Sequence, residues 1–266
     1  MNNKKHTFVI CAYEESKYLE SCILSLKNQK IESTILMVTA TPNAHIEGLA
    51  EKFEIPLFIN RGEKGMVQDW NFALDQCSTP YVTIAHQDDI YFENYAKIAL
   101  KELEECEKPL IFFSDYVEIR ENIFVAQNGL LRVKRLMLLP LKYRTLQKSR
   151  FVRRRILSLG NPICCPTVTY AMNHLPRPIF TKGFNSNQDW ESWERISKLR
   201  GSFIYGYKKK AMAHRIHENS ETSRMIMGQM RKEEDYKMFC KFWPKCFAEL
   251  LVKLYSRSEK YNQLER

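Results

Sequence analysis

PYVTIAHQDDIYF, residues Pro80–Phe92, is the stretch from which the fold of this chain can be inferred. Tyr81 to Ala85 is a short apolar and partly β-branched run, which is typical of a buried strand. The run is followed by two adjacent carboxylates, Asp88 and Asp89, and then by an aromatic-rich helical pattern. In an open α/β sheet, ligands bind just beyond the carboxyl ends of the strands. The sequence therefore predicts two acidic side chains at a ligand-binding edge.

Two neighbouring carboxylates at a strand end suit one hard divalent cation, which takes oxygen ligands and shares them with substrate phosphates. A second interpretation is structural. Asp is a favoured N-cap residue, so Asp88 or Asp89 could serve only to cap the next helix. The pair alone does not distinguish a cation site from a helix cap. The rest of the sequence is needed to decide between these two interpretations.

Further apolar runs indicate strands before and after this stretch, at Thr7–Ala12, Thr34–Thr39, Pro56–Ile59 and Leu110–Asp115. Apolar side chains at helical spacing lie between them. Strands that alternate with helices predict an α/β fold, with a mostly parallel central sheet flanked by helices. The chain has no GxGxxG after its first strand and no GxxxxGK[ST], which argues against a dinucleotide enzyme and a P-loop NTPase.

The composition is that of a globular protein, with 44% hydrophobic and 12% aromatic residues among 266. The net charge of +10 predicts attraction to anionic partners. The eight cysteines form no CxxC pair, so we expect buried thiols in a reducing compartment. The N-terminus lacks a signal peptide pattern, and no apolar run is long enough to span a bilayer. We expect a cytoplasmic protein that can touch the inner face of a membrane.

The second half of the chain changes in character, because no acidic residue occurs from Asn122 to Gln188. Within it, the segment 130–158 is basic and amphipathic, which fits an anionic membrane surface or a phosphate-bearing ligand. The alternative is a solvated basic face over ordinary core. The tail 224–266 is predicted to be helical with an apolar face, which either packs on the core or adds to a membrane-facing surface.

Several separated motifs occur in an order that resembles the inverting family 2 glycosyltransferases of GT-A fold. They are Tyr13-Glu14-Glu15, then Asn60, Gly65 and Asn71, then Gln87-Asp88-Asp89, Gln188-Asp189-Trp190 and Arg215-Ile216-His217. The resemblance covers roughly residues 6 to 223 and implies a GT-A catalytic domain over 1–223. Its half 1–120 would bind the nucleotide sugar, and its half 121–223 would bind the acceptor.

The resemblance also implies a role for each matching residue. Asp89 would be the main ligand of Mn²⁺ or Mg²⁺, with His217 closing the metal–diphosphate site, and Asp189 would be the catalytic base. Nucleotide-sugar contacts would come from Ala12, Tyr13, Glu15, Thr39, Asn71 and Asp88.

The sequence departs from the family pattern in three of its motifs. Thr39 and Ala40 stand where an Asp often reads the nucleobase, Trp70 replaces the Arg that often precedes Asn71, and Gln188 replaces the Glu before the base. The identity of the nucleotide is therefore less constrained than the type of reaction.

These residues could carry out an inverting displacement. A cation neutralises the departing diphosphate, and one carboxylate takes the proton of the acceptor hydroxyl. Ser186 to Asp189 also matches a capping box, a role that can coexist with catalysis, and His217 could be a structural histidine. We expect transfer from a UDP-sugar to a glycan or lipid-linked acceptor in surface polysaccharide synthesis.

Two other functions fit parts of this sequence. A sugar-phosphate nucleotidyltransferase also uses paired carboxylates and a cation, but the glycine-rich phosphate loop after the first strand is missing. A basic nucleic-acid-binding protein would fit the net charge. That function gives the carboxylate pair no purpose, so we expect no nucleic acid among the partners.

Overall fold

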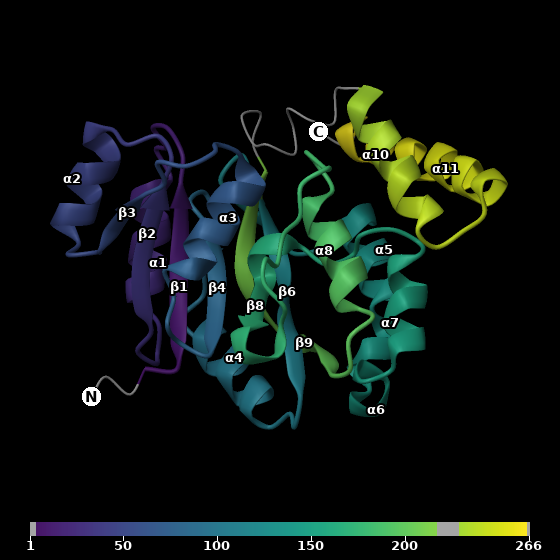
Figure 1. The fold of residues 1–266 in the computed structure, drawn as a ribbon, viewed down its shortest axis with the longest axis horizontal. Helices are drawn as coiled ribbons and strands as arrows, with labels where there is room; N and C mark the ends of the chain where they lie inside the picture. Colours follow the sequence, from purple (N-terminus) through teal and green to yellow (C-terminus); the bar gives the residue numbers. More distant parts are fainter. Residues whose placement is uncertain (1–3, 217–228, 265–266) are drawn as a thin grey trace.

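A computed structural model describes residues 4–216 and 229–264 of the chain (Figure 1). These residues form one nine-stranded sheet with the strand order β3-β2-β1-β4-β8-β6-β9-β5, and β7 pairs with β6. The two predicted halves of the catalytic domain share this sheet, because β4 of the first half pairs directly with β8 of the second half.

The first half alternates strands and helices as the apolar pattern predicts. Its elements are β1 (His6–Ala12), α1 (Leu19–Lys27), β2 (Thr34–Thr39), α2 (Ala44–Lys52), β3 (Leu57–Ile59), α3 (Met66–Asp75) and β4 (Tyr81–His86). The four strands are parallel, with Ala12 of β1 opposite Thr39 of β2 and Cys11 opposite His86 of β4. Their carboxyl ends therefore meet at one edge of the sheet, the edge where the carboxylate pair follows β4.

The strands after β4 make the sheet mixed. The elements that follow β4, up to β9, include β5 (Ile90–Tyr91), α4 (Tyr95–Glu104), β6 (Pro109–Arg120), β7 (Ile123–Val125), β8 (Val168–Ala171) and β9 (Ser202–Ile216). Parallel pairing holds between β6 and β9, whereas β5, β7 and β8 run antiparallel to their neighbours. The apolar pattern does not encode strand direction, and direction depends on where each connection returns the chain.

The long strand β9 joins two separate apolar runs of the sequence. The runs Ser202–Tyr205 and Ala211–Ile216 each predict a short strand, and β9 runs through both. Ser114 of β6 lies opposite Gly206, but Asp115 lies opposite Lys210, so β9 has extra residues in between. A bulge of this kind bends a strand without ending it, and the polar residues at the bulge interrupt the apolar pattern.

The remaining helices lie on the side of the molecule where β6, β8 and β9 are, away from β1, β2 and β3 (Figure 1). They are α5 (Gly129–Met137), α6 (Arg144–Gln147), α7 (Arg150–Leu157), α8 (Gln188–Ile196), α10 (Gln229–Cys240) and α11 (Lys245–Leu264), with 3₁₀ turns at Leu139–Lys142, Cys165–Thr167 and Met172–His174. Burial of Met238 and Phe239 shows that α10 packs on the core. In α11, Phe247, Leu250 and Leu254 stay exposed. The tail thus packs on the core through α10, while α11 leaves apolar side chains exposed.

The basic segment 130–158 is a set of short helices, and several of its arginines point into the protein. Arg153 is 1% exposed and donates to the carbonyl oxygens of Ser197 (2.8 Å) and Gly201 (2.6 Å), beyond the end of α8. A cation at a helix C-terminus stabilises the unpaired carbonyl groups there. Arg135 and Arg154 pair with carboxylates of other elements. Only part of the predicted cationic face is therefore available to a partner.

None of the helices within residues 4–216 and 229–264 has both the length and the apolar character needed to cross a membrane.

Candidate active site

The carboxylate pair lies directly after β4, and β9 holds it in place. Asp89 is completely buried, and its Oδ1 accepts a hydrogen bond from the backbone N–H of Arg215 (2.8 Å). His214 Nδ1 lies 3.0 Å from the same oxygen, and Arg215 Nε donates to the carbonyl oxygen of Asp88 (3.0 Å). These contacts tie the carboxylate pair to a strand more than a hundred residues later in the chain.

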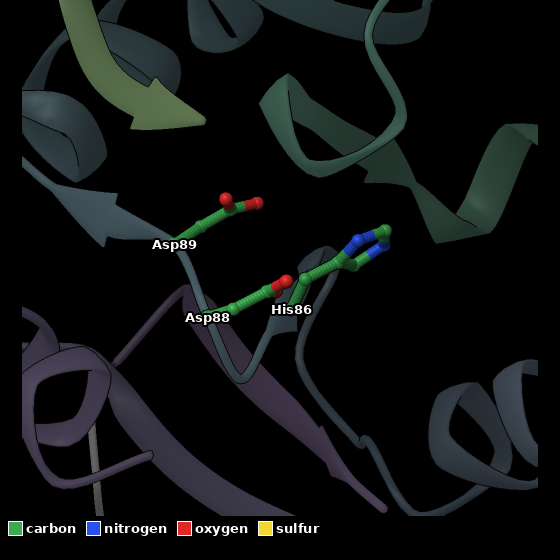
Figure 2. Close-up of side chains that lie close together, drawn as sticks. All are labelled: His86, Asp88 and Asp89. Atoms are coloured by element: carbon green, nitrogen blue, oxygen red, sulfur yellow. The ribbon is translucent and has the colours of Figure 1, made fainter. Parts of the chain in front are cut away.

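The side chains around the pair fit a divalent cation. His86, Asp88 and Asp89 each offer one ligand atom, and these atoms lie within 4.8 Å of one another (Figure 2). The His86 ring stacks on Trp70, with 5.6 Å between the ring centroids. Burial lowers the pKa of His86, although the charges of Asp89 and Asp88 partly oppose this. A neutral imidazole beside two carboxylates is a donor set suited to Mn²⁺ or a similar ion.

Sequence reasoning missed His214, which lies beside the pair. Burial alone would lower its pKa, but the charge and hydrogen bond of Asp89 together with Asp88 hold the pKa of His214 above its ordinary value. A signal was available, because His214 directly precedes the Arg-Ile-His motif in the sequence. His217, the histidine predicted to close the metal–diphosphate site, lies outside the described residues.

The loop after β1 is tied to the carboxylate loop. Gln87 Nε2 donates to the carbonyl oxygen of Tyr13 (2.9 Å), and Gln87 Oε1 accepts from its N–H (3.0 Å). Glu14 has φ 51°, and its N–H donates to Thr41 Oγ1 (2.7 Å) after β2. A non-glycine residue in this left-handed region persists only where its surroundings hold it. The loops after β1, β2 and β4 are therefore held together as one rim.

Most of the residues predicted to contact the nucleotide sugar lie at or near this rim. Ala12 and Thr39 are buried at the ends of β1 and β2, and Thr39 Oγ1 accepts from the N–H of Thr41 (3.0 Å). Tyr13 and Glu15 are exposed in the loop after β1.

Asn71 differs from the other predicted nucleotide-sugar residues. Its amide donates to the carbonyl oxygen of Phe180 (2.8 Å) and accepts from the N–H of Phe180 (3.1 Å). Asn71 thus joins α3 to the segment before α8.

Asp189 lies in the first turn of α8 with both oxygens engaged. Asn161 Nδ2 donates to its Oδ2 (2.8 Å), and the N–H of Trp190 donates to its Oδ1 (2.7 Å). Burial raises the pKa of Asp189, and these two hydrogen bonds only partly offset the effect. The predicted capping box is not formed, because the N-cap residue is Asn187 and makes no side-chain capping bond. A carboxylate with a raised pKa is suited to take a proton.

Asp189 shares its surroundings with the carboxylate pair. The charges of Asp89, Asp88 and Asp189 all act on the pKa of His86, and those of Asp89 and Asp189 both act on Cys164. Charges on a protein influence one another over about 10 Å. Asp189 and the carboxylate pair are thus within electrostatic reach of the same two side chains, His86 and Cys164.

A carboxylate of the C-terminal tail holds the loop before α8, a feature that sequence reasoning also missed. Glu234 of α10 accepts hydrogen bonds from the backbone N–H groups of Asn185 (2.7 Å), Ser186 (2.8 Å) and Asn187 (3.2 Å). Asn187 Nδ2 also donates to Asp235 Oδ1 (2.8 Å). The start of the helix that carries Asp189 is therefore fixed by α10.

Comparison with known proteins identifies the family of the chain. The chain belongs to glycosyl transferase family 2, whose family model matches residues 7–170, more than half of its length. It is a glycosyltransferase, as the motif order predicts. No curated protein sequence matches the chain.

Solved structures confirm the GT-A type of fold. S. aureus TarS in complex with UDP-GlcNAc is similar with a TM-score of 0.65 and 15% identity, over 93% of this chain and 70% of that one. The mannosyltransferase PcManGT of Pyrobaculum calidifontis, with GDP-Man and Mn²⁺, gives 0.60 and 12%, over 95% and 69%. Glucosyl-3-phosphoglycerate synthase of Mycobacterium tuberculosis, with UDP, gives 0.55 and 11%, over 90% and 80%.

Proposed function

We propose that the protein transfers a sugar from a nucleoside-diphosphate sugar to an acceptor hydroxyl with inversion, using Asp189 as the base. The observation that carries the proposal is the group of His86, Asp88 and Asp89 after β4, with ligand atoms within 4.8 Å of one another, in a chain of glycosyl transferase family 2. The raised pKa of Asp189 supports its role as the base. A UDP-sugar is the proposed donor, since two of the three structures named above are complexes with uridine nucleotides.

The residues of this chain would divide the reaction between them. Asp88, Asp89 and His86 would hold a divalent cation, which when bound neutralises the diphosphate that departs. His214 and Arg215 fix the position of Asp89. On the other side of the site, Asp189 takes the proton of the acceptor hydroxyl as that oxygen attacks the anomeric carbon. A single displacement on the face opposite the leaving group inverts the anomeric configuration.

The acceptor is proposed to be a glycan or a lipid-linked sugar of surface polysaccharide synthesis at the inner face of a membrane. Support comes from α5 and α11, which lie against each other. Both helices expose large apolar side chains, namely Val133, Leu136, Phe247, Leu250 and Leu254. The helices α5 and α7 also carry exposed basic residues, namely Arg132, Arg150 and Arg155. Apolar and basic side chains together favour an anionic lipid surface.

The transfer proposal is tested by donor turnover in two variants. In Asp189→Asn, kcat should fall by about 10² to 10⁴-fold, because the proton acceptor is lost. In Asp89→Asn, activity should fall together with the affinity for Mn²⁺. The control is Asp75→Asn, an exposed carboxylate at the end of α3. The control should keep wild-type turnover. If Asp189→Asn or Asp89→Asn also keeps wild-type turnover, the role assigned to that residue is wrong.

The membrane proposal is tested separately by vesicle sedimentation. Wild-type protein should bind vesicles that contain anionic phosphatidylglycerol more strongly than vesicles of phosphatidylcholine. The double variant Leu136→Ser with Leu250→Ser should reduce this binding. Equal binding to both kinds of vesicle would contradict membrane association and leave the transfer chemistry untouched.

A further inference from the structure

A half-buried carboxylate of α3, which the proposed reaction does not use, lies at the carboxyl ends of β2 and β3. Asp69 is in the first turn of α3, and Asn60 Nδ2 donates to its Oδ1 (2.7 Å). Asn60 directly follows β3, and its backbone N–H donates to the carbonyl oxygen of Thr39, the last residue of β2 (2.8 Å). Only the side chain of Asn60 therefore separates Asp69 from the ends of these two strands.

The same hydrogen bonds connect Asp69 to the rim formed by the loops after β1, β2 and β4. Thr39 Oγ1 accepts from the N–H of Thr41, and Thr41 Oγ1 accepts from the N–H of Glu14 in the loop after β1. Burial, and after it the charge of Asp69, raises the pKa of Cys11, the last residue but one of β1. Charges on a protein influence one another over about 10 Å. Asp69 is thus within electrostatic reach of the end of β1 as well.

No basic side chain among the described residues pairs with Asp69. Burial raises the pKa of Asp69, and the hydrogen bond from Asn60 partly offsets this effect. Its Oδ1 accepts the bond from Asn60, whereas Oδ2 accepts none from the part of the chain that the structure describes. A carboxylate oxygen taken out of water normally meets a donor from a ligand or a water molecule. Since no cation is present to attract a phosphate here, an N–H group of a ligand is the matching donor.

The order of the strands indicates which part of a nucleotide would meet Asp69. The proposed function places the diphosphate at the cation site after β4. On one side of β4, β1 and β2 run parallel to it and continue the binding edge, whereas β8 on the other side runs antiparallel. Neighbouring strands lie about 4.8 Å apart, so the end of β2 is about 10 Å from the end of β4. A nucleoside spans such a distance, which brings its base to the ends of β2 and β3.

We propose that Asp69 selects the nucleotide of the donor by accepting a hydrogen bond from the N3–H of uracil. The inference rests on the function proposed above and adds a specificity-determining residue to it. Uracil carries a single ring N–H between two carbonyl groups, and a single oxygen of Asp69 is open to it. Cytosine has an acceptor nitrogen at that position, which a carboxylate repels. Guanine presents two N–H donors side by side and would need both carboxylate oxygens, of which Asn60 holds one.

The test measures nucleotide binding to the full-length protein by calorimetry in saturating Mn²⁺, with UDP, UDP methylated at N3, and CDP as probes. The wild type should bind UDP about tenfold or more tightly than either of the other two, as expected for one hydrogen bond to a charged group. In Asp69→Ala, the affinity for UDP should fall to about that for the methylated nucleotide.

A second variant, Asp69→Asn, preserves the shape of the side chain. Its amide oxygen can still accept from Asn60, which turns its NH₂ group towards the base. That group can donate to N3 of cytosine but opposes the N3–H of uracil, so the preference for UDP over CDP should shrink by about tenfold. The matched control is Asp75→Asn at the exposed end of the same helix, which should leave all three affinities unchanged.

Two outcomes would overturn the assignment. One is equal affinity of the wild type for UDP and its N3-methylated form. The other is a loss of affinity in the Asp69 variants by the same factor for all three nucleotides, which would mean that Asp69 only holds Asn60 in place. Both results leave the proposed function standing, because the wild type still binds UDP with Mn²⁺. A wild type that binds no nucleoside diphosphate, GDP included, would instead refute the proposed function itself.

Discussion

His86 is the residue that sets this carboxylate pair apart chemically, because it adds nitrogen to an otherwise all-oxygen donor set. Nitrogen ligands favour Mn²⁺ over Mg²⁺, whereas carboxylates suit Mg²⁺ well. We expect wild-type protein to prefer Mn²⁺. In His86→Asp, this preference should narrow by about tenfold, the lower end of what changes around a metal site cause. Calorimetric titration of both ions in the presence of UDP measures it. An unchanged preference would show that His86 is not a ligand.

Asp189 offers a pH test that is independent of the cation. Its pKa is raised by burial and lowered in part by the hydrogen bond from Asn161. A base works only when deprotonated, so kcat/KM should fall as the pH drops through the raised pKa. In Asn161→Ala the charged form loses a donor, so the acidic limb of the profile should move to higher pH. A profile that stays in place would separate Asp189 from the proton transfer.

At the level of elements, the C-terminal tail supports the helix that carries the proposed base. Glu234 of α10 accepts three backbone N–H groups of the loop that begins α8. In Glu234→Gln the charge-assisted character of these bonds is lost, so stability should fall by about 1 to 3 kcal/mol. We expect kcat to fall by about tenfold or more with a smaller change in KM, since a misplaced base slows the reaction rather than the binding.

The neighbouring Glu233 provides the matched control, because it is exposed on the same turn of α10. Glu233→Gln should leave both the thermal stability and the kinetics near wild type. If the Glu233 and Glu234 variants behave alike, α10 does not position Asp189, and its role is only to cover the core.

The elements themselves were largely predictable, and the exceptions have physical reasons. The strand Thr34–Thr39 was predicted with its observed bounds, because it is a compact apolar run between turn residues. The sequence pattern predicts that the basic segment forms one amphipathic surface. Arg153 of this segment is instead buried and donates hydrogen bonds to carbonyl oxygens beyond the end of α8. Sequence pattern reports where charges are, whereas the partner of a buried arginine depends on residues far away in the chain.

For the whole molecule, the motif order identified the family and the carboxylates, but it could not supply the contacts that assemble them. Asp89 is held by β9, and Asp189 lies on a helix held by α10. Both contacts join residues that are distant in sequence, and neither shows as a local pattern. Glu234 was missed for this reason, because it acts through tertiary placement alone. His214 adjoins the Arg-Ile-His motif in the sequence, but its contact with Asp89 likewise depends on tertiary placement.

The stability of the whole domain should depend on pH through His6, a residue far from the proposed chemistry. His6 is completely buried in β1, with Nδ1 2.9 Å from Ser33 Oγ and Nε2 2.9 Å from Thr83 Oγ1. Burial lowers the pKa of His6 to about 3. In the unfolded chain the pKa is near 6.5. Below that value the unfolded state binds a proton that the folded state does not, so stability is lost as the pH falls from about 6.5 towards 3.

The contribution of His6 to this slope should be at most about 1.4 kcal/mol per pH unit. In His6→Gln, the amide can still bond to both hydroxyl groups but cannot take up a proton, so this part of the slope should disappear. Urea unfolding between pH 4 and pH 7 measures the difference, with added salt to screen surface charges. A variant whose stability falls with acid as steeply as that of the wild type would mean that carboxylates, rather than His6, control the acid response of the fold.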